Sequence, residues 1–258
     1  MPKPYINYQA ISYKSGETSE TSDAITIEKA LQIAINGKSF VVVMQTPGDE
    51  LNLCRGLLLS EDIINSKTSV LYKTSKSEDG YIEGVDCIIE IDSLGEGYKS
   101  ARSLLSVSSC GICGKQDLDS LNLTGNQLNS NSLEADFIFE LQKTMQSNQP
   151  IFPITGSTHG SALFDISGNL LVLKEDVGRH NALDKAIGEL LLKDKLKDAK
   201  ILFFSGRLSF EIIFKSFRAK IPTIIAISAP TSLAIDYAKE FGITLYGFCR
   251  DDRFTRYS

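Results

Sequence analysis

The second half of the chain alternates short apolar strands with amphipathic helices, and this alternation limits the fold more than any other feature. Residues 161–164 and 169–173 predict a hairpin, because the turn-forming run Asp165-Ile166-Ser167-Gly168 separates them. Strands connected by helices are nearly always parallel with right-handed crossovers, so this half predicts an α/β sheet with helices on its faces. The other predicted strands are residues 201–204, 223–227 and, as the last strand, 244–248; the helices are 134–146, 181–192 and two that end near Ala219 and Phe241.

The loops that leave parallel strands gather at the carboxyl edge of a sheet, where open α/β folds bind their ligands. Arginine side chains and helix N-termini both bind phosphate oxygens. We therefore expect a phosphate-bearing ligand at this edge, although each arginine there could instead be a solvated surface charge. The loops concerned contain Gly178-Arg179-His180, Ser205-Gly206-Arg207, residues 228–232, and residues 248–253 with Arg250 and Arg253.

The first half predicts a smaller α+β unit. A strand is expected at residues 5–13, a helix at 27–35 behind a Ser/Thr/Asp-rich stretch, a strand at 40–45 and a helix at 50–59. Asp79-Gly80 is a turn signal between two further strands. Residues 116–131 are rich in Asn, Leu and Ser without strong periodicity, so the expected domains are residues 1–115 and 116–258.

The charge and hydropathy of the chain exclude several classes of partner. A formal net charge of −5 lacks the basic field that broad binding to nucleic acids or membrane surfaces requires. The N-terminal residues contain no apolar core of a signal peptide, and no apolar run reaches the ~18 residues of a membrane span. We expect a cytoplasmic protein that binds neither nucleic acid nor membrane.

Two of the five cysteines lie close together, in Cys110-Gly111-Ile112-Cys113-Gly114. A structural zinc site usually needs four ligands, and Cys54, Cys87 and Cys249 are isolated in sequence, the first two among apolar neighbours typical of packing. A thioredoxin-type redox pair begins a helix, which the flanking glycines disfavour. The third possibility is a flexible tether whose thiolate carries a sulfur atom as a persulfide, and the Ser/Gly-rich surroundings favour it.

Both histidines lie at the ends of predicted elements. For His159 and His180, a capping or satisfied polar contact competes equally with a role in ligand binding. Asn181 with Asp184 resembles a capping pair, which strengthens the structural explanation for His180.

Five motifs carry a resemblance to a known family: SSCGICG, TGSTHGSALF, EDVGRHNALDKAIG, SGRLSFE and ISAPTSLAIDYAKEFG. In this order, over almost the whole chain, they resemble the FdhD/NarQ family of formate dehydrogenase accessory sulfurtransferases. The resemblance implies that a cysteine desulfurase loads the cysteine loop. It further implies that the sulfur then passes to the molybdenum of a Mo-bis(molybdopterin guanine dinucleotide) cofactor destined for formate dehydrogenase. It also implies a homodimer and a cytidine deaminase-like, three-layer αβα fold for residues 116–258.

The resemblance also assigns residues to roles. Cys110 becomes the persulfide bearer and Cys113 its partner for relay or resolution. A carboxylate such as Asp251 could accept a hydrogen bond from the guanine edge, while the arginines of the edge contact phosphates. The implied cofactor-binding residues are Phe248, Cys249, Arg250, Asp251, Asp252 and Arg253, together with Gly206 and Arg207.

Two other functions compete with sulfur transfer. A zinc-dependent deaminase needs an H-x-E motif followed by P-C-x-x-C, but the corresponding positions read His180-Asn181-Ala182 and Ser205-Gly206-Arg207-Leu208. Deaminase chemistry is therefore not supported, and no resident metal is expected. A chaperone that delivers the cofactor without touching sulfur is the second competitor.

Overall fold

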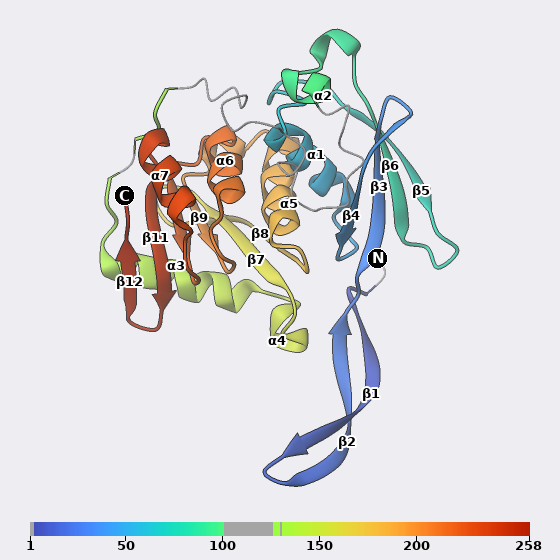
Figure 1. The fold of residues 1–258 in the computed structure, drawn as a ribbon, viewed down its shortest axis with the longest axis vertical. Coiled ribbons are helices and arrows are strands. Elements are labelled where there is room, and N and C mark those ends of the chain that lie inside the picture. Colours follow the sequence, from blue (N-terminus) through green and yellow to red (C-terminus); the bar gives the residue numbers. More distant parts are fainter. Residues whose placement is uncertain (1–2, 101–125, 130) are drawn as a thin grey trace.

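The computed structural model describes residues 3–100, 126–129 and 131–258, which form two larger sheets, a protruding hairpin and the helices between them (Figure 1). This mixed α/β fold agrees with the prediction. In the part of the chain that the structure describes, no helix is long and apolar enough to cross a membrane.

The larger sheet has six strands and follows the predicted βα alternation. Its strands are β7 (His159–Phe164), β8 (Leu170–Asp176), β9 (Ile201–Phe204), β10 (Thr223–Ala226), β11 (Thr244–Arg250) and β12 (Arg253–Arg256), in the spatial order β12-β11-β10-β9-β7-β8. The predicted hairpin is β7 with β8, and β9, β10 and β11 are parallel neighbours. The strand predicted at 244–248 is β11, but it is not the last strand, because the charged edge strand β12 returns antiparallel to it.

Helices cover both faces of this sheet (Figure 1). Helix α3 (Ala135–Asn148) lies on one face, where Ile138, Leu141 and Met145 share a core with Phe203 of β9. Leu202, the preceding residue, belongs to the core on the opposite face, since successive side chains of a strand point to opposite sides. That face carries α5 (Arg179–Leu192), α6 (Phe210–Arg218) and α7 (Ser232–Phe241), and a 3-10 turn at Leu196–Asp198 follows α5.

The N-terminal part contains a second, four-stranded sheet. Its strands are β3 (Lys29–Ile35), β4 (Lys38–Gln45), β5 (Leu71–Lys76) and β6 (Ile82–Ile88), in the order β4-β3-β6-β5. Helix α1 (Glu50–Ser60) agrees with the prediction of a helix at 50–59. Short 3-10 and α turns follow β6 at Ile91–Ser93 and, as α2, at Glu96–Ser100.

The predicted helix at residues 27–35 is strand β3 instead. Leu31, Ile33 and Ile35 are fully buried while the residues between them are more exposed, which is the two-residue period of a strand. Ala, Leu and Gln favour a helix intrinsically, but the sheet pairing overrides this preference. Asn36 and Gly37 both have positive φ, at 51° and 76°, and form the tight turn into β4.

A two-stranded arm extends away from both sheets (Figure 1). It consists of β1 (Tyr5–Lys14), which agrees with the strand predicted at 5–13, and β2 (Glu17–Thr26), which lies in the Ser/Thr/Asp-rich stretch for which no strand was predicted. The arm is anchored at its base, because the Thr26 hydroxyl hydrogen-bonds to Thr155 Oγ1 at 2.8 Å and to Ser157 Oγ at 2.7 Å.

The N-terminal sheet and the six-stranded sheet share one continuous hydrophobic core. Helices α1 and α5 meet so closely that a Cβ on Gly56 would lie 1.9 Å from the carbonyl oxygen of Asp184. A Cβ on Gly188 would lie 1.8 Å from the carbonyl oxygen of Asn52. The predicted domain boundary between residues 115 and 116 lies outside the described residues.

Candidate functional site

The loops that follow β9, β10 and β11 lie together at the carboxyl edge of the six-stranded sheet, as predicted. The Leu208 N–H donates to the carbonyl of Ala229 at 3.0 Å, which joins the first loop to the second. The Phe248 N–H donates to the carbonyl of Ser228 at 3.1 Å, which joins the second loop to the third. The edge is therefore a single hydrogen-bonded surface rather than three independent loops.

The segment from Phe248 to Arg253 forms the end of β11, a tight turn and the start of β12. Phe248 and Asp251 have positive φ values of 53° and 55°, and the strand pairing shifts register between Gly247 and Arg250. Such an irregularity turns successive side chains in new directions. The side chain of Phe248 is 40% exposed, and those of Arg250, Asp251, Asp252 and Arg253 are also exposed.

Cys249 differs from its neighbours because its side chain is buried. Its thiol lies 3.5 Å from Oε1 of Gln142 on helix α3. Burial raises the pKa of this thiol to about 11, so it stays protonated at neutral pH. The side chain of Cys249 therefore packs in the hydrophobic core with residues of α3, unlike the exposed side chains beside it.

The three predicted arginines share this edge. The Arg250 Nε–H donates to the carbonyl of Ile227 at 3.1 Å, and the guanidinium carries further N–H donors. Arg253 is the strand partner of Arg250, and Arg207 is exposed in the loop after β9. These cations can bind phosphate groups across the edge.

Gly206 allows a second side chain to approach the same loop. A Cβ at this position would lie 3.1 Å from the ring of Phe204 and 3.3 Å from both Cβ and Cδ of Arg179. The absence of a side chain therefore lets Arg179, at the start of α5, lie across the loop that leaves β9.

A cavity of about 650 Å³ adjoins the loop edge on the α3 side of the sheet. Strand β7 is antiparallel to β9, so the start of β7 meets the end of β9 at this edge. His159 and Ser205 come from these two strand ends and line the cavity with Ile227, whose carbonyl binds Arg250. The remaining wall comes from Gln146 and Gln149 of the α3 end, Phe152, Pro153, Gly156, Ser157 and Thr158.

His159 and Ser205 form a polar pair in this cavity. Ser205 Oγ lies 3.4 Å from His159 Nδ1 and accepts a hydrogen bond from the Gly160 N–H at 2.9 Å. Partial burial, followed by the charges of Arg179 and Arg207, lowers the pKa of His159. The imidazole is therefore neutral at neutral pH and can accept or donate one hydrogen bond toward a ligand.

Glu175 holds the rim of the cavity in place, a role that the sequence did not indicate. Its buried carboxylate accepts from the backbone N–H groups of Ile151 and Phe152 at 2.7 and 2.8 Å, and from the Thr158 hydroxyl at 2.8 Å. The N–H groups belong to the start of the short helix α4 (Phe152–Thr155). The sequence shows only that an acidic residue lies near the end of a predicted strand. These hydrogen-bond partners of Glu175 are 17 to 24 residues away, too far to be predicted from the sequence.

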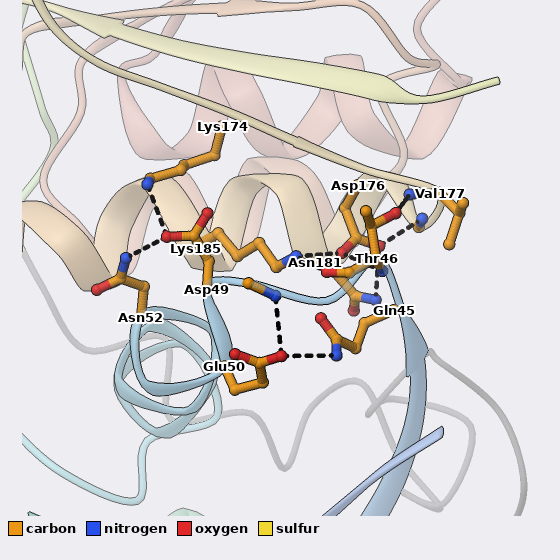
Figure 2. A network of polar contacts seen from close by, with 12 residues as sticks. Gln45, Thr46, Asp49, Glu50, Asn52, Lys174, Asp176, Val177, Asn181 and Lys185 are labelled. Carbon is orange, nitrogen blue, oxygen red and sulfur yellow. Dashed lines mark hydrogen bonds and ion pairs between the residues drawn. The ribbon is translucent and has the colours of Figure 1, made fainter. Parts of the chain in front are cut away.

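A buried ion pair fixes the start of helix α5 to the N-terminal sheet (Figure 2). Lys185 Nζ lies 2.6 Å from Asp176 Oδ2 and donates to the carbonyl of Thr46 at 2.5 Å. Asp176 also accepts from the backbone N–H groups of Thr46 at 3.0 Å and Gly178 at 2.7 Å. The exposures of Asp176 and Lys185 are 0% and 1%, so this pair is shielded from water.

The proposed Asn181–Asp184 capping pair was wrong. Asn181 Nδ2 donates to the Met44 carbonyl at 2.8 Å and to Asp176, and so joins the network of Figure 2. Asp184 faces the other way and binds Lys215 Nζ at 2.8 Å and the Ser60 hydroxyl at 2.7 Å. Both side chains connect elements that are distant in sequence, whereas a cap acts within one helix.

Cys110 and Cys113 lie outside the described residues. Within residues 3–100, 126–129 and 131–258, no group of His, Cys, Asp or Glu side chains could hold a metal ion.

Comparison with known proteins decides the family. The sequence profile of the FdhD/NarQ family matches residues 26–258. The chain belongs to the FdhD/NarQ family. This FdhD/NarQ protein is 39% identical over 246 residues to the sulfur carrier protein FdhD of Sulfolobus acidocaldarius, covering 95% of this chain and 93% of the relative. It is 40% identical over 248 residues to the same protein of Saccharolobus solfataricus, covering 94% and 92%.

A solved structure agrees with the fold of this FdhD/NarQ protein. The crystal structure of a protein from Desulfotalea psychrophila, described as a formate dehydrogenase accessory protein, aligns with a TM-score of 0.75. The alignment covers 99% of this chain and 97% of the other, at 23% sequence identity. The likeness supports the whole arrangement of both sheets.

Proposed function

We propose that this protein is a sulfurtransferase of the carrier type. Cys110 receives sulfur as a persulfide from a cysteine desulfurase, and the sulfur passes to the molybdenum of Mo-bis(molybdopterin guanine dinucleotide), which formate dehydrogenase requires. The observation that carries the proposal is the joined carboxyl edge with three arginines beside a cavity, in a chain whose relatives are sulfur carrier proteins. We also propose that the protein is a homodimer and that it is located in the cytoplasm.

The client cofactor is a substrate of the transfer rather than a resident group, and the edge suits its chemistry. Its guanine nucleotide ends carry phosphates, for which Arg207, Arg250 and Arg253 supply cations at one rim. The adjoining cavity of about 650 Å³ has the size typical of small-molecule sites. Gln149 and His159 line it, and their amide and imidazole groups can hydrogen-bond a planar heterocycle.

The transfer chemistry needs both cysteines of the motif. The Cys110 thiolate attacks the terminal sulfur of the desulfurase persulfide, and the sulfur–sulfur bond to the desulfurase breaks with loss of its thiolate. Only when the client cofactor is bound does the Cys113 thiolate attack the inner sulfur of Cys110 and release the terminal sulfur as hydrosulfide for the metal. The Cys110–Cys113 disulfide that remains is reopened by a dithiol reductant.

Sulfur loading tests the carrier role directly. The protein is incubated with a cysteine desulfurase and cysteine, and the peptide that contains Cys110 is examined by mass spectrometry for one added sulfur atom. The wild type is expected to gain it, and Cys110→Ala is expected to lose it. Cys87→Ala, at a buried thiol on β6, serves as the matched control and should load normally.

Two results would contradict the proposal. One is the absence of a sulfur adduct on the wild-type peptide. The other is full formate dehydrogenase activity in cells that carry only the Cys110→Ala variant, which would indicate a chaperone that delivers the cofactor without transferring sulfur. Both measurements use the complete chain, so neither depends on separate folding of one half.

A further inference from the structure

Helix α4 forms part of the rim of the cavity but has no hydrophobic anchor of its own. It is a single turn, and none of its residues is buried. A helix this short is unstable by itself in water, so contacts with other elements must hold it in place. The rim matters to a ligand because Phe152, Pro153, Gly156 and Ser157, which belong to α4 or directly follow it, line the cavity.

Glu175 holds the two ends of this rim segment. Its carboxylate accepts hydrogen bonds from the N–H groups of Ile151 and Phe152 at the start of α4, and from the Thr158 hydroxyl beyond the helix. Between these points the chain makes a sharp turn at Gly156, whose φ of 64° lies in the left-handed region. The position of this middle part depends on a further contact.

The middle of the rim is attached to the base of the arm (Figure 1). Thr26 is the last residue of β2 and is only 8% exposed. Its hydroxyl donates to Thr155 Oγ1 at 2.8 Å and lies 2.7 Å from Ser157 Oγ. These partners are 129 and 131 residues away in sequence, so the contacts join two separate parts of the fold.

The hydroxyl groups form a directed chain, because each of them carries a single proton. Thr155 donates its proton to the carbonyl of Ile151 at 3.2 Å, so its oxygen accepts from Thr26. Thr26 has then used its own proton, and its contact with Ser157 requires the Ser157 hydroxyl as the donor. Hydrogen bonds in such a chain polarise and strengthen one another. Thr26 is therefore the link on which the two other hydroxyl groups depend.

We propose that Thr26 is a positioning residue for the ligand cavity, because it holds the rim through Thr155 and Ser157. The base of the arm thereby supports the cavity, although the described residues that line the cavity come from other elements. A guanine nucleotide as the ligand of the cavity rests on the proposed function, whereas the attachment of the rim to the arm does not.

Thr26→Val removes this link with little change in shape. Valine is branched at Cβ like threonine and is favoured in strands. Ser157 is exposed and can turn its hydroxyl to water, and Thr155 keeps its bond to Ile151, so the fold is expected to remain intact. Thr26→Ser keeps the hydroxyl and is the conservative rescue. Thr18→Val, at an exposed position of the same strand, is the matched control.

Amide hydrogen exchange, followed by nuclear magnetic resonance on the complete chain, tests the rim without any ligand. The amides of Thr155 and Gly156 are expected to exchange about tenfold faster in Thr26→Val than in the wild type, the equivalent of one lost hydrogen bond. Thr26→Ser and Thr18→Val are expected to exchange as the wild type does. The amide of Ala162, within β7, should be unchanged in every variant, which shows that the effect is local.

Calorimetry with guanosine diphosphate tests the consequence for the cavity. The affinity is expected to fall about two- to tenfold in Thr26→Val, because the ligand must then order the rim itself, and to be restored in Thr26→Ser. A merely structural role would lower the Tm and leave this affinity unchanged. Sulfur loading at Cys110 is expected to stay at the wild-type level in both variants.

Unchanged exchange of the rim amides in Thr26→Val would overturn the proposal, and so would faster exchange with unchanged nucleotide affinity. Ser157→Ala breaks the same chain from its other end, at an exposed residue, and is expected to give the same faster exchange at Gly156. Failure of the wild type to bind guanosine diphosphate would contradict the ligand named under the proposed function. The exchange measurement would still decide whether Thr26 holds the rim.

Discussion

Replacing Lys185 by Met should destabilise the whole molecule, because it leaves a buried carboxylate without its cation. Asp176 would keep its hydrogen bonds from Thr46 and Gly178, but the ammonium 2.6 Å away would be lost together with its bond to the Thr46 carbonyl. Removing one partner of a buried pair costs about 3–5 kcal/mol. For a chain of this size this corresponds to a fall in Tm of about 6–20 °C.

Urea and thermal unfolding monitored by circular dichroism measure this loss. Lys193→Met is the matched control: this exposed lysine pairs with Glu189 one turn away, so its removal should cost at most about 0.5 kcal/mol. The double variant Asp176→Asn with Lys185→Met should be more stable than the sum of the single losses by about 1–3 kcal/mol. The reasoning is refuted if Lys185→Met remains within about 1 kcal/mol of the wild type.

Three further predictions concern packing, binding and pH. Gly56→Ala should lower the unfolding free energy by at least about 1–3 kcal/mol in urea titrations, because its Cβ would overlap the backbone of Asp184; an unchanged midpoint would contradict the close contact of α1 with α5. Arg253→Ala should weaken binding of guanosine diphosphate in calorimetry while sulfur loading stays intact, and unchanged affinity would disprove the phosphate role. His180 has a lowered pKa of about 4 against an ordinary 6.5, so its burial stabilises the fold above pH 6.5, and this contribution of about 3 kcal/mol is lost as the pH falls toward 4. His180→Gln should flatten this part of the stability profile, and an equally steep profile would show that another group is responsible.

The sequence predicted strands β7 to β11 of the larger sheet, because each of these elements has a local signal, whereas the charged edge strand β12 has none. Apolar runs such as residues 201–204 separated by helical patterns indicate βα units, and the handedness rule then brings the loops to one edge. The position of the arginines at that edge was predicted from this rule alone. Strand β2 was not predicted, because it is exposed along most of its length and rich in polar residues, so its sequence has no apolar period.

The interior of the site could not be predicted in the same way. Asp176 accepts a hydrogen bond from the backbone of Thr46, which is 130 residues away in sequence. Glu175 accepts hydrogen bonds from backbone N–H groups, which no pattern of side chains reveals. The local propensity of residues 27–35 favours a helix, whereas strand β3 is specified by its sheet pairing and by the Asn36-Gly37 turn into β4. Long-range polar contacts and turns between half-exposed strands are the features that a single sequence specifies least.

The contact between α1 and α5 also determines when the chain can fold during its synthesis. Ser60 on α1 binds Asp184 on α5, and 124 residues separate them. At a translation rate of about 5–20 residues per second, α5 follows α1 by roughly 6–25 s. Throughout that interval the apolar side of α1, including Leu53 and Leu57, lacks the helix that covers it in the folded protein. We therefore expect the nascent N-terminal sheet to depend on holding chaperones until α5 emerges from the ribosome.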